Sequence, residues 1–318
     1  MGIMVQGKWR TEDFAERNRK GSYIRAGTSF RGWVGGGDFP AAAGRYHLVV
    51  AHACPWAHRT LIFRALKGLE EVISVAFVEP LMLENGWVLA NGGDPVTGAR
   101  YAHQVYAQAD PDYSGRCSVP ILWDKTAHTI VSNESSEIIR MLNSAFDDLA
   151  AKSVPDLYPE YLREEIDAVN ELVYENINNG VYRTGFATTQ AAYENSFNAL
   201  FDALDKMETR LAGQRYLTGA RITEADWRLF ATLVRFDAVY VGHFKCNRQR
   251  IADFPQLSNY LRELYQWPGI AGTVDIPRIK EHYYGSHRAI NPFGVVPDGP
   301  ALDFDAPHDR ERLPRAAA

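Results

Sequence analysis

Cysteine is scarce in this chain of 318 residues, and it is not arranged in pairs. The three cysteines, Cys54, Cys117 and Cys246, are widely spaced and odd in number, which does not fit a disulfide framework. A reducing compartment is therefore favoured, and we expect the protein in the cytoplasm. His52 and His58 flank Cys54, but their spacing matches no zinc pattern and a fourth ligand is missing, so we expect no metal.

Long hydrophobic runs and an excess of one charge are also missing. No apolar stretch approaches the roughly 20 residues that a membrane-spanning helix requires, and residues 1–8 lack the apolar core of a signal peptide. The formal net charge is −5 and no long block carries one sign, so neither nucleic acid nor a membrane is an expected partner. The glycine-rich residues 92–98 lack the lysine of a phosphate loop and predict only a turn.

What is present is a cysteine at a predicted turn from strand to helix. Residues 46–51 form an apolar run typical of a buried strand, and apolar residues recur at helical spacing over residues 61–69, with Gly68 as the stop. Pro55 suits the first turn of that helix. A sulfur at Cys54 would face the free N–H groups and positive end of the helix, which favours the thiolate. Position 57 is alanine, so the site has one thiol and needs a second from another molecule.

The chain divides into four predicted segments. Residues 1–44 are rich in charge and glycine, and we expect an extension that packs over another surface. Residues 45–145 alternate strands and helices, which predicts an α/β domain. Residues 155–286 have helical periodicity, and residues 287–318 are rich in proline and glycine, so we expect an all-helical domain and a coil.

The α/β segment has a definite predicted order after the cysteine helix. The expected elements are a strand at 72–78, a polar insertion at 84–113, a hairpin-like pair at 119–123 and 129–131, and a helix from 132 or 133 to about 142. In the helical segment, Leu200, Leu204, Met207 and Leu211 share one face, and Thr223 with Asp226 predicts a helix N-cap.

This arrangement resembles the glutathione transferases, in which a thioredoxin-like α/β domain precedes an all-α helical bundle. Within them the chain is similar to the glutathionyl-hydroquinone reductases, the Xi class. The motifs that carry the resemblance are CPWAHR at 54–59, ENGW at 84–87, NNGVY at 178–182, RFD at 235–237, HFKCN at 243–247 and HYYGSH at 282–287. The resemblance runs from about residue 22 to residue 300, and the family also has an N-terminal extension and a C-terminal coil.

The resemblance implies an activity and a set of partners. Glutathione is the implied co-substrate, glutathionylated aromatic molecules are the implied substrates, and a homodimer is the implied assembly. The Cys54 thiolate attacks the glutathione sulfur, the hydroquinone leaves as its carbon is protonated, and a mixed disulfide remains. A second glutathione resolves that disulfide and gives glutathione disulfide.

Two segments are expected to hold glutathione. In thioredoxin-like folds the proline at Pro120 is cis, which exposes the backbone of Val119 to pair with the cysteinyl backbone of glutathione. An ordinary edge-strand proline is the alternative interpretation. Glu134 and Ser135 open a helix whose free N–H groups suit the γ-glutamyl carboxylate, while Glu134 suits the ammonium group beside it. Without the resemblance, these two residues read as a simple capping sequence.

Four further residues are assigned to glutathione mainly by the resemblance. Arg116 would meet the glycyl carboxylate or a nearby backbone group, and Cys117 and Ser118 lie in the same segment. We expect an aliphatic residue in relatives at position 117, and whether Cys117 takes part in redox chemistry stays open. Trp87 either closes over glutathione, as in the family, or packs down within the insertion.

Tyrosines would supply the acid chemistry. Residues 178–180 are an unfavourable sequence for the middle of a helix, so Tyr182 is expected to project into the cleft between the domains. By resemblance it is the proton donor or acceptor for the aromatic substrate. Tyr240 and Tyr283 match family tyrosines that donate hydrogen bonds to the cysteine sulfur, with Tyr284 as the alternative to Tyr283.

Two other functions remain open from the sequence. One is a general thioltransferase or dehydroascorbate reductase, as in omega-like transferases, which would share the Cys54 chemistry. The other is a non-catalytic binding protein with the same fold, against which Cys54 and the tyrosines argue.

Overall fold

The computed structural model describes residues 2–11, 18, 20–25, 27–152 and 154–316. Residues 1, 12–17, 19 and 26 of the predicted extension and 317–318 of the predicted tail lie outside the described residues. The chain forms two compact units. The first comprises Met1–Ala15, Ala26–Val154 and Pro277–Ser286, and the second Glu16–Arg25, Pro155–Ile276 and His287–Ala318. Residues 277–286 are thus grouped with the first unit, apart from the rest of the predicted helical segment.

A four-stranded sheet, in the order β4-β3-β5-β6, forms the centre of the first unit. The central strand β3 (Tyr46–Val50) is buried along its whole length, between β4 (Ser74–Phe77), which is parallel to it, and β5 (Ile121–Asp124), which is antiparallel. β6 (Thr129–Ser132) forms a hairpin with β5. The continuous apolar run at 46–51 suits this position, because a strand covered on both faces needs apolar side chains on both.

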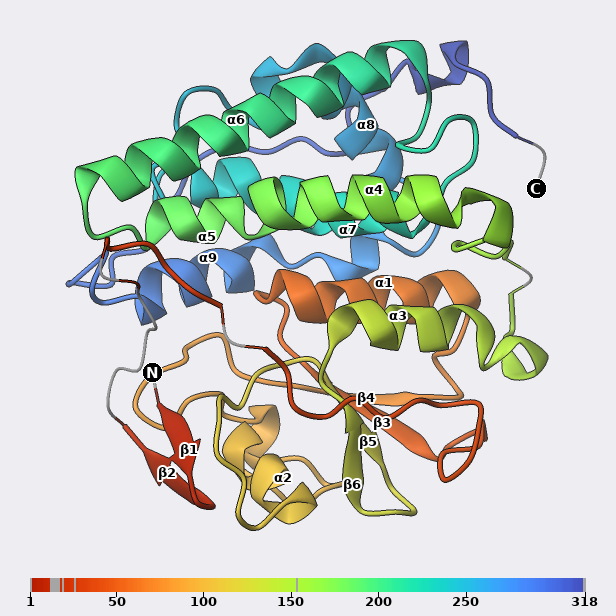
Figure 1. Ribbon diagram of the computed structural model, residues 1–318, viewed down its shortest axis with the longest axis vertical. Helices are drawn as coiled ribbons and strands as arrows, with labels where there is room; N and C mark the ends of the chain where they lie inside the picture. Colours follow the sequence, from red (N-terminus) through yellow and green to blue (C-terminus); the bar gives the residue numbers. More distant parts are fainter. Residues whose placement is uncertain (1, 12–17, 19, 26, 153, 317–318) are drawn as a thin grey trace. The chain divides into compact units, whose positions relative to one another are not determined.

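Helices α1 (Pro55–Lys67) and α3 (Ser135–Ser144) pack against each other beside this sheet (Figure 1). α1 ends at Gly68, which has φ +66° and donates its N–H to the last turn, as the sequence predicts. α3 begins two or three residues later than predicted, because Glu134 rather than an earlier residue caps it. The third long helix of the unit is α9 (Ile276–Ser286).

Two short elements of the first unit were not predicted. Strands β1 (Ile3–Val5) and β2 (Lys8–Arg10) form a hairpin, and α2 (Ala102–Ala109) lies inside the polar insertion. Trp9 ties the hairpin to the insertion: its Nε1 donates to the Glu84 carbonyl at 2.9 Å, and its ring stacks on His103 at 4.6 Å. The start of the chain therefore packs over another surface, as expected for the extension.

The second unit is built from helices. Their bounds are α4 (Arg163–Val173), α5 (Gly180–Gly185), α6 (Gln190–Gly213), α7 (Glu224–Arg235) and α8 (Pro255–Tyr265). The predicted face of α6 is buried. The predicted N-cap of α7 is also confirmed, because the Thr223 N–H donates to Asp226 Oδ2 at 2.8 Å.

Residues 178–180 lie at a junction between helical segments and not in the middle of one helix, as their sequence predicts. A π-helical turn, Tyr174–Asn178, joins α4 to α5, which starts at Gly180. The buried Asn178 side chain donates to the Arg228 carbonyl at 3.1 Å and to Thr232 Oγ1 at 2.8 Å. These bonds offset the poor helix propensity of asparagine. A second π-helical turn, Phe236–Tyr240, follows α7, and turns of this kind are frequent at functional sites.

The C-terminal tail forms hydrogen bonds with the end of α6 and the residues that follow it. Most of its described residues lack regular structure, as predicted, but Arg310 is fully buried. Its guanidinium donates to the carbonyls of Leu211 at 2.8 Å, Gln214 at 2.9 Å and Arg215 at 2.5 Å. An arginine distant in sequence thereby donates to one carbonyl in the last turn of α6 and to two carbonyls just beyond its end. No helix in the described part of the chain is both long and apolar enough to cross a bilayer.

Candidate active site

Cys54 is the N-cap residue of α1, as predicted. Its backbone is extended, and Sγ accepts a hydrogen bond from the Ala57 N–H at 3.5 Å. The thiol also donates to the Val119 carbonyl, 3.3 Å away. The side chain is partly exposed. A partly exposed sulfur at the positive end of a helix has the surroundings in which thiolates are stabilised.

The other two cysteines have different surroundings. Cys246 is fully buried and Cys117 is half-buried, and none of the three cysteines forms a disulfide. Burial raises the pKa of the Cys117 thiol and of the Cys246 thiol well above the ordinary value. Burial therefore disfavours the thiolate form of both side chains.

The segment opposite Cys54 has the predicted backbone. The Val119–Pro120 peptide bond is cis, and β5 begins directly after it at Ile121. Two tyrosines of the insertion hold the preceding loop. Tyr106 donates to the Ser118 carbonyl at 2.8 Å, and Tyr113 donates to the Arg116 carbonyl at 2.9 Å. Sequence reasoning missed both tyrosines, because nothing in their local pattern marks contacts with residues further along the chain.

Glu134 and Ser135 lie at the N-terminus of α3. Glu134 Oε1 accepts from the Ser136 N–H at 3.0 Å and from Ser136 Oγ at 2.8 Å, and Oε2 accepts from Thr28 Oγ1 at 3.2 Å. Burial opposes ionisation of Glu134, but these hydrogen bonds and the charge of Arg59 outweigh it and hold the pKa of the carboxyl below its usual range. A negative charge is therefore fixed beside the free N–H groups of a helix end.

Trp87 is largely buried within the first unit. It is 8% exposed, and its ring stacks on His282 of α9 with centroids 4.8 Å apart. His282 Nδ1 lies 2.8 Å from the Pro80 carbonyl, which fixes the imidazole beside the insertion. The next residue, Tyr283, is buried, and Tyr284 is half-buried.

Each unit thus holds one part of the predicted site. The first unit contains the cysteine, the cis-proline loop, the start of α3, Trp87 and the two tyrosines of α9. The second contains Tyr182 and Tyr240, whose ring centroids are 6.2 Å apart. Phe244 packs on Tyr182 at 5.4 Å, and the guanidinium of Arg25, which sequence reasoning did not find, lies 5.0 Å from the Tyr182 ring.

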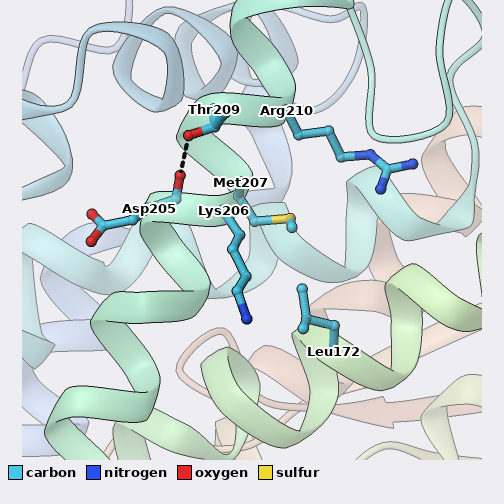
Figure 2. A pocket seen from close by; sticks show the side chains of 6 residues that line it. All are labelled: Leu172, Asp205, Lys206, Met207, Thr209 and Arg210. Carbon is cyan, nitrogen blue, oxygen red and sulfur yellow. Dashed lines mark hydrogen bonds between the residues drawn. The ribbon is translucent and has the colours of Figure 1, made fainter.

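An open cavity of about 480 Å³ in the second unit does not belong to this set. Figure 2 shows its lining, which comes from α4 and α6: Leu172, Asp205, Lys206, Met207, Thr209 and Arg210. The Thr209 hydroxyl donates to the carbonyl of Asp205 within the same helix at 2.9 Å. Within the described ranges, no three His, Cys, Asp or Glu side chains are grouped as metal ligands would be.

A thioredoxin-like unit with one helix-capping cysteine, together with an all-helical unit, is the architecture of the glutathione transferases. Family models match both parts: the glutathione S-transferase N-terminal domain over residues 53–145 and the C-terminal domain over residues 190–263.

Individual relatives cover almost the whole chain. The glutathionyl-hydroquinone reductase PcpF of Sphingobium chlorophenolicum is 54% identical over 95% of this chain and 97% of its own. A Xi-class transferase from Natrialba magadii superposes with a TM-score of 0.92, at 48% identity over 99% of this chain and 98% of that one. The glutathione-bound structure of YqjG, a glutathione transferase homologue from Escherichia coli K-12, gives a TM-score of 0.89 at 49% identity, over 98% and 99%. The chain therefore belongs to the glutathione transferase family and, within it, to the Xi class of glutathionyl-hydroquinone reductases.

Proposed function

We propose that this protein reduces glutathionyl-hydroquinones to hydroquinones at the expense of glutathione. The observation that carries the proposal is Cys54, a single thiol that caps α1 beside the Val119 carbonyl, with alanine at position 57. A helix-capping thiol without a partner cysteine suits a reaction in which glutathione supplies the second thiol. The reductase name of a relative 54% identical over nearly the full length supports the choice of substrate.

The reaction has two displacement steps. In the first, the Cys54 thiolate attacks the thioether sulfur of the substrate, a disulfide bond forms between the two sulfurs, and the bond from sulfur to the aromatic carbon breaks. The carbon takes the electron pair and a proton, so the ring leaves as hydroquinone. In the second, a glutathione thiolate attacks the mixed disulfide, which releases glutathione disulfide and restores the Cys54 thiolate.

The glutathione part of the substrate would bind in the first unit. Val119 would pair its backbone with the cysteinyl residue, the N-terminus of α3 and Ser135 would receive the γ-glutamyl carboxylate, and Glu134 would receive the ammonium. Arg116 would meet the glycyl end, with Cys117 and Ser118 along the same edge. For Trp87 we propose a role in covering the bound tripeptide.

The tyrosines complete the proposed machinery. We assign to Tyr182 the transfer of a proton to the aromatic carbon, and to Tyr240 and Tyr283 hydrogen bonds that stabilise the Cys54 thiolate, with Tyr284 as the alternative for the last role. The buried positions of Tyr240 and Tyr283 support donors held in fixed directions. We also propose that the protein acts as a homodimer in the cytoplasm, which light scattering and cell fractionation would test.

The decisive experiment offers the purified protein a glutathionyl-hydroquinone together with glutathione. We expect one hydroquinone and one glutathione disulfide for each substrate consumed, measured by liquid chromatography. Mass spectrometry after a single turnover should find glutathione on Cys54. No release of hydroquinone, or an adduct on Cys117 or Cys246, would contradict the proposal.

A further inference from the structure

Arg59 is a buried charge for which the proposed reaction has no role. It lies on α1, five residues after Cys54, and is 1% exposed. Its Nη1 donates to Ser135 Oγ at 3.5 Å, and its guanidinium lies 4.5 Å from the centroid of the Trp56 ring. Because a guanidinium stays charged in proteins, α1 places a permanent positive charge next to the start of α3.

The charges around the start of α3 form a pattern. The N-terminus of the helix and Arg59 are positive, and Glu134 is negative and already accepts three hydrogen bonds. Ser135, the first residue of the helix, is 3% exposed, and its hydroxyl accepts a hydrogen bond from Arg59. A ligand with a carboxylate and an ammonium group on one carbon matches this pattern. A ligand without the carboxylate places no negative charge near Arg59 and the N-terminus of α3.

We propose that Arg59 is a positioning residue that sets the thiol specificity of the enzyme: it orients the Ser135 hydroxyl and supplies the positive charge that selects a free α-carboxylate on the γ-glutamyl residue. The inference rests on the proposed glutathione site, and it adds the residue that makes that site discriminate. Arg59 acts through Ser135 and through its charge, so it does not need to touch the tripeptide. Buried charge acts strongly here, since little water screens it.

The test compares two ligands that cannot react. S-methylglutathione carries the α-carboxylate, and S-methyl-γ-aminobutyryl-cysteinyl-glycine lacks only that group. Isothermal titration calorimetry would give both dissociation constants for the wild type, Arg59→Met and Arg59→Lys. We expect Arg59→Met to weaken S-methylglutathione about tenfold, the effect of one lost charge interaction, and to change the other ligand less than about twofold. Arg59→Lys should recover part of the preference.

A matched control lies on the same helix. Arg64 also belongs to α1, but it donates to the carbonyls of Ile73 and Glu70 and does not bond Ser135. Arg64→Met should lower the melting temperature without changing the ratio of the two dissociation constants. If Arg59→Met does not fold, Ser135→Ala tests the same link with Arg59 in place, and the ratio should again fall.

The possible failures can be told apart. Equal weakening of both ligands by Arg59→Met would show a general packing role, and an unchanged ratio in Arg59→Met or Ser135→Ala would also overturn the inference. A wild-type protein that binds neither ligand would instead overturn the proposed glutathione site. A wild type that binds both ligands equally would overturn the inference, because no selection for the α-carboxylate would exist. A wild type that discriminates but releases no hydroquinone would contradict the proposed reaction and leave the role of Arg59 standing.

Discussion

Helices α1 and α3 of the first unit each have an ionisable side chain at the N-cap position, a thiol in α1 and a carboxyl group in α3. Cys54 caps α1 with a sulfur 3.5 Å from the Ala57 N–H, and Glu134 caps α3 with an oxygen 3.0 Å from the Ser136 N–H. The carboxylate accepts two further hydrogen bonds from hydroxyl groups, whereas the sulfur is large, polarisable and partly exposed. In the proposed reaction the first helix end would support the reactive thiolate, and the second would hold a carboxylate that takes part only in binding.

Replacing the thiol that caps α1 should have the largest effect on activity. In Cys54→Ser the hydroxyl still caps the helix but is scarcely ionised at neutral pH and forms no mixed disulfide. We expect reduction of the thioether to fall by at least about a thousandfold, while the affinity for S-methylglutathione changes little. Steady-state assays and calorimetry would measure the two quantities. Substantial reductase activity in Cys54→Ser would mean that another group is the nucleophile.

Replacing the carboxylate that caps α3 should weaken the binding of glutathione and leave the chemical step nearly unchanged. Glu134→Gln keeps the shape and one capping acceptor but removes the charge proposed to meet the ammonium group. We expect KM for glutathione to rise about tenfold with kcat nearly unchanged, because a charge-assisted hydrogen bond is lost equally from the ground and transition states. A fall in kcat without a change in KM would place Glu134 in the chemical step.

The charge of Glu134 should also make the stability of the folded protein depend on pH. The pKa of Glu134 is lowered in the folded protein, so its ionised form stabilises the fold above the usual pKa of about 4.3, and this contribution is lost as the pH falls through the folded value. Glu134→Gln should therefore unfold at a lower temperature than the wild type at pH 7. The gap should narrow as the solution is acidified below about pH 4, and thermal melts across this range would show it. A difference in melting temperature that does not change with pH would mean that the charge of Glu134 does not stabilise the fold.

The smallest effect is expected at Cys117. Burial raises the pKa of this thiol, which disfavours the thiolate, so we expect no second nucleophile at this position. Cys117→Val should leave kcat and KM within about twofold of the wild type. It should also leave unchanged the number of thiols that iodoacetamide labels rapidly at pH 7. A loss of glutathione disulfide formation in this variant would give Cys117 a part in resolving the mixed disulfide.

Local signals explain what the sequence could predict. The apolar run before Cys54, Pro55 and Gly68 defined the strand, the start and the end of α1, because these residues act on their own neighbours. The Thr223 cap was predicted for the same reason, whereas the cis Val119–Pro120 bond was predicted from the resemblance to thioredoxin-like folds.

Contacts between distant segments explain what could not be predicted. The β1–β2 hairpin depends on Trp9 reaching the insertion, α2 is short, and the π-helical turn at Asn178 depends on bonds to α7. From the sequence alone, Arg59 would be expected on the exposed surface of a helix, whereas in the structure it is buried next to the start of α3. The role of Trp87 was left open between two alternatives, and only the structure shows it stacked on His282.

The buried guanidinium of Arg310 has a consequence for how the molecule is made. The carbonyl of Leu211, in the last turn of α6, and those of Gln214 and Arg215, just beyond its end, accept hydrogen bonds from a residue almost 100 positions later in the chain. Any folding of the second unit before Arg310 is synthesised takes place without these hydrogen bonds. A chain that ends before Arg310 would keep every proposed catalytic residue but would lack the hydrogen bonds that hold the end of α6 and the two residues after it.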